Sequence, residues 1–257
     1  MEPIYTPANT TAAYQLNWSL TLFWRAAAAD DSTWLRALGT VTEPDGVRIL
    51  KHEHGDERAS LFLLSTQPPV SPARLLRFIK GRLQHLLRGT MPKAFRRNYS
   101  LRSVGSANRG AIDAYIAGQL GHHPTADERV QRRLHGHQAQ HPEADLSAPR
   151  ESAHGQYWFN LHVVLVSEGR WMEIRDDVLA GLGRAVERTA AKHQHALSRR
   201  AILPDHIHLA IGCPEGQSPE EIALSYMNNC AHACGMRPVL KHSYYVGTFG
   251  EYDLGAV

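Results

Sequence analysis

The chain has 257 residues and a mass of 28.7 kDa, enough for two small domains or one large one. With 43% hydrophobic and 21% charged residues, its composition is that of a soluble globular protein, and no apolar run approaches the roughly 18 residues that cross a bilayer. The start of the chain lacks the basic region of a secretory signal, and three cysteines are too few for a disulfide framework, so we expect a cytoplasmic protein.

Three segments recur in the same order along the chain, which indicates a duplicated domain. In the first pair, YQLNWSLTL from Tyr14 matches YWFNLHVVL from Tyr157, and the alternation of apolar and polar residues predicts a strand in each. In the second pair, Ser71 precedes Pro72 as Ser218 precedes Pro219. A serine N-cap followed by a proline in the first turn predicts the start of an amphipathic helix.

The third pair matches NYSLRSVGSANRGAI from Asn98 with SYYVGTFGEYDLGAV from Ser243. The separations are nearly constant: 143 residues from Tyr14 to Tyr157, 147 from Ser71 to Ser218 and 145 from Asn98 to Ser243. Each copy therefore reads as strand, helix, strand, strand, helix, strand, which predicts an α/β protein of the α+β type, with antiparallel sheets backed by helices.

A basic segment runs from Ala73 to Arg102 and contains no Asp or Glu. Such a segment is either a solvated helix face or a surface that neutralises phosphates. The basic side chains are Arg74, Arg77, Lys80, Arg82, Arg88, Lys93, Arg96, Arg97 and Arg102.

The next predicted helix carries Tyr115 and Gln119 and follows the step Ser103-Val104-Gly105. Side chains four residues apart share a helix face, so a phenol and an amide oxygen can reach a common metal and phosphate. The alternative is an ordinary amphipathic helix with a half-buried tyrosine. After it, residues 124–156 are rich in His, Gln, Arg, Glu and Pro and are predicted to form an exposed linker.

The run ILPDHIHLAIG predicts a strand on which His206 and His208 share one face while Ile207 and Leu209 point into the core. Two neutral imidazoles side by side can hold one divalent cation, although such a triplet is often structural. Asp205 is expected on the opposite strand face. Further along, Cys230, His232 and Cys234 could bind zinc, but their spacing fits a buried helix face better.

The run Leu-Pro-Asp-His-Ile-His-Leu resembles the HUH signature of the single-tyrosine transposases of bacterial insertion sequences, including the repeat-associated tyrosine transposases. The helix with Tyr115 and Gln119 after a Ser-Val-Gly step resembles the nucleophile helix of the same family. The resemblance covers most of the chain outside the linker. It implies two tandem ferredoxin-like domains packed as a pseudo-dimer: residues 10–123, a linker at 124–156, and residues 157–257.

The two signatures fall in different copies. At the separation of 147, Ala59 and Leu61 stand where the second copy has its histidine pair, and at 145 the equivalent of Tyr115 would lie beyond Val257. The fused pair therefore keeps one composite site. The triplet His52-Glu53-His54 is discounted as a metal pair because its centre is charged and it lies upstream of the aligned strand.

The resemblance implies Mg²⁺ or Mn²⁺ held by His206, His208 and Gln119, with Tyr115 attacking a DNA phosphate to form a 5′-phosphotyrosine link. The implied partner is single-stranded DNA containing a hairpin, and the implied state is a monomer that acts as an intramolecular pseudo-dimer. A lysine typical of the family is missing from the helix at residues 225–229. The residues expected to hold DNA are Arg74, Arg77, Lys80, Arg82, Arg96, Arg97 and Arg102.

Two alternatives stay open. A domesticated, inactive transposase-derived protein could keep the fold and the basic surface and bind DNA without cutting it. A hydrolytic metalloenzyme unrelated to DNA would need an additional carboxylate ligand, and the expected orientation of Asp205 argues against it.

Overall fold

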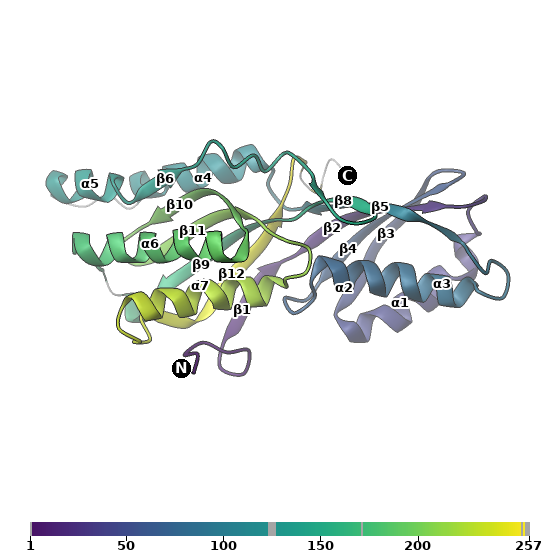
Figure 1. Ribbon diagram of the computed structural model, residues 1–257, viewed down its shortest axis with the longest axis horizontal. Helices are drawn as coiled ribbons and strands as arrows, with labels where there is room; N and C mark the ends of the chain where they lie inside the picture. Colours follow the sequence, from purple (N-terminus) through teal and green to yellow (C-terminus); the bar gives the residue numbers. More distant parts are fainter. Residues whose placement is uncertain (1, 123–126, 171, 253, 255–257) are drawn as a thin grey trace.

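The computed structural model describes residues 2–122, 127–170, 172–252 and 254. Two six-stranded sheets follow one another along the long axis of the molecule, each backed by helices (Figure 1). This arrangement confirms the predicted α+β class. Within the described residues, no helix is long and apolar enough to cross a membrane.

The two halves of the chain follow the same order of elements. The first half consists of β2 (Asn17–Trp24), α1 (Leu35–Thr42), β3 (Val47–Asp56), β4 (Ala59–Thr66), α2 (Pro72–Leu76), α3 (Arg82–Leu87) and β5 (Phe95–Val104), with a π-helical turn at Arg77–Gly81 between α2 and α3. The second half consists of β9 (Asn160–Ser167), α6 (Asp176–His193), β10 (Ala196–Ile202), β11 (His206–Gly212), α7 (Pro219–Ala233) and β12 (Leu240–Phe249).

Strand order identifies each half as ferredoxin-like. The first half pairs its strands in the order β3-β4-β2-β5, and the second in the order β12-β9-β11-β10. When the four strands of each half are numbered 1 to 4 along the chain, both sheets have the order 4-1-3-2, the first one read from β5 to β3. The registers agree as well, because Asn17 lies opposite Ser65 and Asn160 lies opposite Gly212. The helix starts are also as predicted, with Ser71 and Ser218 as N-caps before a proline.

Each sheet is completed by a strand that leads into the other half. Strand β1 (Thr11–Gln15) runs into β2 but pairs in parallel with β12, and β8 (Gly155–Trp158) runs into β9 but pairs in parallel with β5. The halves thus exchange arms symmetrically. The other elements are α4 (Arg109–His122), α5 (Glu128–His135), β6 (Gln138–Gln140), which pairs with β10, β7 (Arg150–Glu151), which pairs with β8, and single turns at Asp31–Thr33, Glu43–Asp45 and Glu168–Arg170.

The arms cross where β5 and β12 end, and equivalent hydrogen bonds hold the crossing. The Thr248 hydroxyl accepts from the backbone N–H of Asn17 at 2.8 Å, and the Ser103 hydroxyl accepts from that of Asn160 at 3.0 Å. A β carbon on Gly105 would overlap the carbonyl oxygen of Thr248, and one on Gly250 would overlap that of Ser103. Glycine is therefore required at both positions by the close approach of the two chains.

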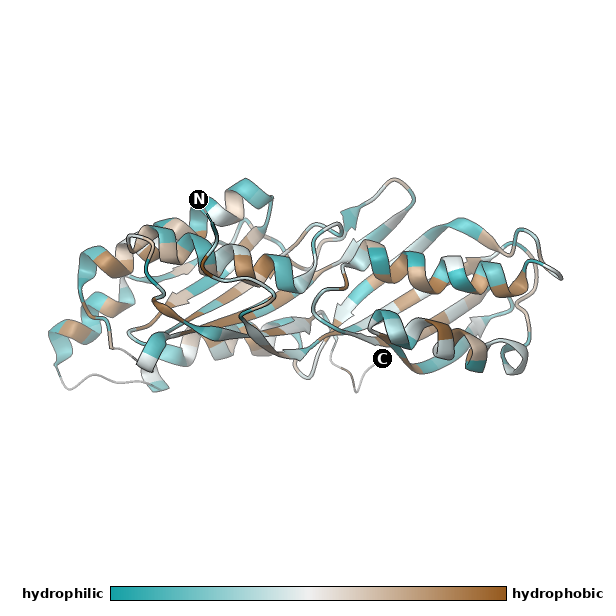
Figure 2. Ribbon diagram, turned by 90° about the horizontal axis from the view of Figure 1, so that it is seen from below, coloured by the Kyte–Doolittle hydropathy of each residue, from teal (hydrophilic) through white to brown (hydrophobic). Residues whose placement is uncertain are grey.

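The two sheets differ in how their faces are covered. One face of each sheet packs against the helices of its own half, where apolar residues of β2 such as Trp18, Leu20 and Leu22 are fully buried. The strands of the second-half sheet are largely apolar (left in Figure 2). Helix α4, which follows β5 in the chain, covers the other face of this sheet (Figure 1). A small second core forms there from Ile116, Leu146, Ala201, Leu203, Ala210 and Phe249.

Candidate active site between helix α4 and strands β9 and β11

Helix α4 is fastened to the second-half sheet by an ion pair and an apolar contact. Arg199 of β10 donates from Nε to Asp113 Oδ1 at 2.6 Å and from a terminal nitrogen to Asp113 Oδ2 at 3.0 Å. One turn further along, Ile116 is buried against Ala201 and Ala210. These contacts place the exposed side of α4 beside the middle of the sheet.

Three imidazoles lie under this helix. His206 and His208 have ring centroids 4.8 Å apart, and the His208 ring stacks on His162 of β9 at 5.2 Å. All three are less than 10% exposed because α4 covers the face that they occupy. Strand pairing explains the cluster, since β9 and β11 are hydrogen-bonded neighbours.

The imidazoles of the histidine pair are oriented through their Nδ1 atoms. His206 Nδ1 lies 2.6 Å from Asp205 Oδ1, and His208 Nδ1 lies 3.0 Å from His162 Nε2. Burial lowers the pKa of His162 to about 4, so this partner ring is neutral. Partners of this kind commonly fix the tautomer of a metal-binding histidine.

The expectation for Asp205 was wrong. Strand alternation predicted that its side chain points away from His206, yet the two side chains are in hydrogen-bond contact. Strand β11 begins only at His206, so Asp205 belongs to the preceding turn and does not obey the alternation.

Tyr115 stands at the opening of the cluster. Its ring centroid is 5.6 Å from that of His208 and 5.8 Å from that of His162, and 49% of the residue is exposed. The tyrosine lines a cleft of about 590 Å³ together with Ile112, His162, His208 and Tyr245. Tyr115 of α4 and the imidazoles of β9 and β11 therefore line the same cleft.

Gln119 lies one turn beyond Tyr115 and is only 3% exposed. Its side-chain amide donates to the backbone carbonyl of Tyr115 at 3.2 Å. The residue thus sits on the buried side of α4 and does not line the cleft, and its amide nitrogen is engaged by the helix itself.

Sequence reasoning missed two residues of the cleft. His162 occupies the position of Ser19 in the first copy, a substitution that the repeat alignment could have revealed. Tyr245 contacts His162 with a ring separation of 5.8 Å, and burial raises its pKa. Neither belongs to a local motif, because both reach the site through pairing of distant strands.

The predicted DNA-binding side chains occupy the first half. Arg102 is exposed and lies over the Trp158 ring at 4.1 Å, while Lys80, Arg96 and Arg97 line a second cleft of about 580 Å³. Arg74, Arg77 and Arg82 surround the ring of Phe78 at 5.3 to 5.7 Å. Arg82 is also paired with Asp45, so its charge is partly neutralised within the protein.

The triplet His52-Glu53-His54, which the sequence analysis discounted as a metal pair, contributes two residues to a group of possible metal ligands. Among the described residues, one group of three His, Cys, Asp or Glu side chains has its ligand atoms close enough to hold a metal, and it consists of Asp31, His52 and His54. The sequence argument considered strand spacing alone and could not foresee Asp31, which comes from a turn before α1.

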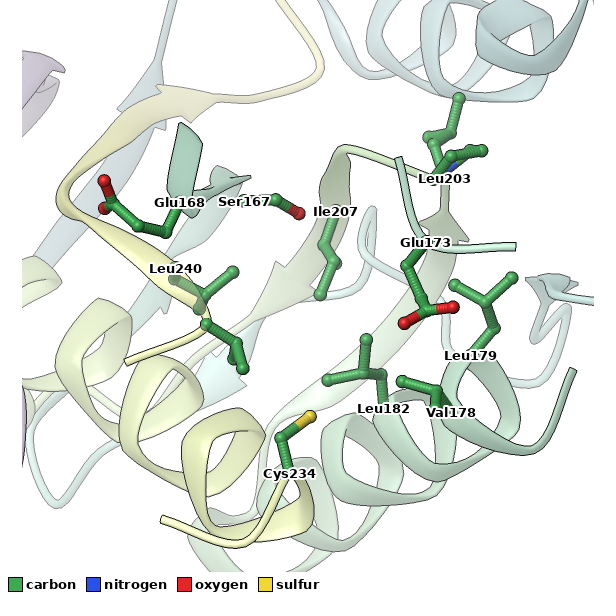
Figure 3. Close-up of a pocket in the computed structure, with 12 residues that line it drawn as sticks. Ser167, Glu168, Glu173, Val178, Leu179, Leu182, Leu203, Ile207, Cys234 and Leu240 are labelled. Atoms are coloured by element: carbon green, nitrogen blue, oxygen red, sulfur yellow. The ribbon is translucent and has the colours of Figure 1, made fainter. Parts of the chain in front are cut away.

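An apolar pocket lies away from the imidazoles. It has a volume of about 240 Å³ and is lined mainly by aliphatic side chains, with Ile207 at its wall and Leu179, Leu182 and Cys234 around it (Figure 3). Ile207 and its two histidine neighbours point to opposite faces of β11, so this pocket belongs to the helix-covered apolar side and not to the candidate site.

No protein-family model matches the chain, and neither does any curated protein. Among solved structures it is similar to a REP-associated tyrosine transposase bound to a REP hairpin (TM-score 0.31, 16% identity, 35% of this chain and 55% of that chain). It is also similar to a candidate glycine cleavage system transcriptional repressor (0.23, 9%, 91% and 98%) and to an unknown protein from Galdieria sulphuraria (0.23, 8%, 91% and 97%). Scores this low carry no argument about function, and the match spans about half of the transposase chain.

Proposed function

We propose that this protein is a metal-dependent enzyme that cuts and rejoins single-stranded DNA through Tyr115, in the manner of the HUH tyrosine transposases. The supporting observation is the 5.6 Å between the rings of Tyr115 and His208, which are 93 residues apart (208 minus 115) and belong to different halves. Tyr115 is half-exposed at a cleft that two buried imidazoles also line, so its hydroxyl is accessible to a bound phosphate.

The residues at the site fit a divalent cation. His206 and His208 each have a hydrogen-bond partner at Nδ1, as metal-binding imidazoles usually do. Gln119 of α4 is the proposed oxygen ligand, as the family resemblance implies. Water ligands would complete the coordination of Mn²⁺ or Mg²⁺, the ions that the family resemblance implies. When bound, the ion would polarise the scissile phosphate and offset its developing charge.

Tyr115 would act as the nucleophile. Its oxygen forms a bond to phosphorus while the bond from phosphorus to the 3′ oxygen breaks, which leaves a 5′-phosphotyrosine and a 3′-hydroxyl. The phenol proton passes to solvent at the open side of the cleft, and the leaving oxygen takes up a proton. Because the link to tyrosine conserves the phosphodiester energy, a 3′-hydroxyl can attack in reverse and rejoin the strands.

The basic side chains of the first half would hold the DNA. Arg102 lies near the end of β5, the strand that leads into α4, and its stacked partner Trp158 offers a flat surface beside it. A guanidinium for phosphate next to an aromatic ring for a base is typical of single-strand binding. We expect Arg102→Ala to weaken hairpin binding, and Arg188→Ala on the exposed side of α6 to leave it unchanged.

The decisive experiment incubates the protein with a labelled DNA hairpin that has a single-stranded flank, in the presence of Mn²⁺. We expect a covalent adduct that disappears in Tyr115→Phe and persists in Tyr14→Phe, a tyrosine of similar exposure that does not line the cleft. An adduct that survives in Tyr115→Phe contradicts the assignment. Hairpin binding that is insensitive to chelator, with no adduct in the wild type, favours the inactive DNA-binding protein instead.

A further inference from the structure

A second cluster of metal-type ligands lies in the first half, on the sheet that lacks the histidine pair. His52 and His54 belong to β3, the edge strand, and Asp31 belongs to the turn that precedes α1. Their ligand atoms all lie within 4.8 Å of one another. Three different backbone positions thus bring two imidazoles and one carboxylate together.

The central ligand is held rigidly. The His52 side chain is fully buried, with its ring 4.9 Å from that of Trp34 and 4.7 Å from that of Phe62. Packing against these two rings leaves the His52 ring little freedom to rotate, so its Nδ1 atom keeps its direction toward Asp31, 2.9 Å away. A rigid ligand lowers the entropy cost of binding an ion.

The other nitrogen of the same ring has a suitable partner. His52 Nε2 lies 3.1 Å from the Ser60 hydroxyl, which also accepts from Trp24 Nε1 at 2.9 Å. A hydroxyl oxygen has two lone pairs, so it can accept from Trp24 and from a protonated His52 Nε2 together. That tautomer places the lone pair of His52 on Nδ1, the atom that faces Asp31.

We propose that Asp31, His52 and His54 bind one divalent transition ion of the Zn²⁺ type, independently of the ion at the proposed catalytic site. Two imidazoles and one carboxylate suit Zn²⁺ better than Mg²⁺ or Ca²⁺, which prefer all-oxygen sites. Ligand bonds of about 2.1 Å require donor separations of about 3.4 Å. The present separations reach 4.8 Å, and the exposed His54 and the partly exposed Asp31 can shorten them by side-chain rotation.

The ion would tie the turn before α1 to the edge strand of the sheet. Three protein ligands leave one position of a tetrahedral ion to water, since His54 and Asp31 face solvent. The metal would join two segments that are otherwise connected at this point by the Asp31–His52 contact and by side-chain packing.

The test titrates the metal-free full-length protein with Co²⁺ alone and follows tryptophan fluorescence. Trp34 lies beside His52, so the bound paramagnetic ion should quench it strongly. We expect His54→Ala to raise the dissociation constant at least tenfold, and Asp31→Asn to do the same. His85→Ala, an exposed histidine on α3, should match the wild type.

The double variant His206→Ala/His208→Ala distinguishes this site from the catalytic one. It should abolish DNA cleavage and leave the Co²⁺ quenching unchanged. Wild-type protein that shows no quenching, quenching that persists in folded His54→Ala, or quenching lost with the His206/His208 pair would each overturn the proposal, whatever the result of the cleavage assay. Circular dichroism of His54→Ala and Asp31→Asn confirms that the variants fold.

Discussion

The two sheets share one plan and differ in what lies on their second face. In the second half, every residue of β11 is buried because α4 covers the face that its histidines occupy. In the first half, the equivalent strand β4 has partly or fully exposed residues at alternate positions from Leu61. The comparison teaches that the candidate site is made by a helix crossing between halves, and that the ligand-bearing strand alone does not form it.

The largest expected effect tests the difference between the two equivalent strands. His208→Ala should reduce adduct formation with Mn²⁺ at least about a hundredfold, because it removes an imidazole of the proposed metal site. Leu61→Ala, at the matching position of β4, should change it by less than about twofold. An equal loss of adduct formation in the two variants would contradict the assignment of the metal site to the second half.

A change at the crossing of the arms should destabilise both halves. Gly105→Ala places a methyl group against the backbone carbonyl of Thr248, and we expect the free energy of unfolding to fall by about 3 to 5 kcal/mol. Gly250→Ala should cost a similar amount because the crossing is symmetric. Chemical denaturation measures both, and Gly89→Ala, where the added carbon meets open space, is the control.

Acid should expose a further difference, since the second half contains His195 buried against Tyr226 and Gln217. Burial lowers the pKa of His195 from 6.5 to about 4. Between these values the unfolded chain binds more protons, so the free energy of unfolding falls as the pH falls through this window, by at most about 3 kcal/mol.

Urea denaturation at pH 7 and pH 5 measures this dependence. His195→Gln should be less sensitive to pH than the wild type, because its side chain does not titrate. His154→Gln, at an exposed histidine, should retain the wild-type dependence. A variant His195→Gln with undiminished acid sensitivity would assign the effect to other groups.

The smallest expected effect distinguishes the positioning of α4 from the overall stability of the protein. Arg199 and Arg200 are neighbours on β10 that reach opposite faces, toward Asp113 of α4 and Glu187 of α6. Asp113→Asn should loosen α4 and lower the cleavage rate about tenfold, which corresponds to about 1.4 kcal/mol in the activation free energy. Glu187→Gln should lower the free energy of unfolding by a comparable amount with little change in cleavage rate. Cleavage kinetics and chemical denaturation of both variants therefore distinguish positioning of α4 from general stability.

Local patterns account for what the sequence could predict. Alternating residues identified the strand with His206 and His208, and serine and proline identified the starts of α2 and α7, because these signals depend on neighbours in the chain. Placing Tyr115 beside that strand required the comparison of the two copies as well.

The remaining features depend on distant pairing. No local signal reports that β1 pairs with β12, or that His162 stacks on His208, since both follow from strands that are far apart in sequence. The segment predicted as a linker contains α5 and β6, and β6 joins β10 through backbone hydrogen bonds that need no particular side chains. Composition therefore carried little information about it.

The exchanged amino-terminal arm has a consequence for biosynthesis. Thr11 pairs with Ser243, 232 residues later, so β1 leaves the ribosome long before its partner exists. At about 5 to 20 residues per second, the delay is roughly 10 to 50 s. A polypeptide whose translation stops early would retain an unpaired strand edge, which favours aggregation and attracts quality-control proteases.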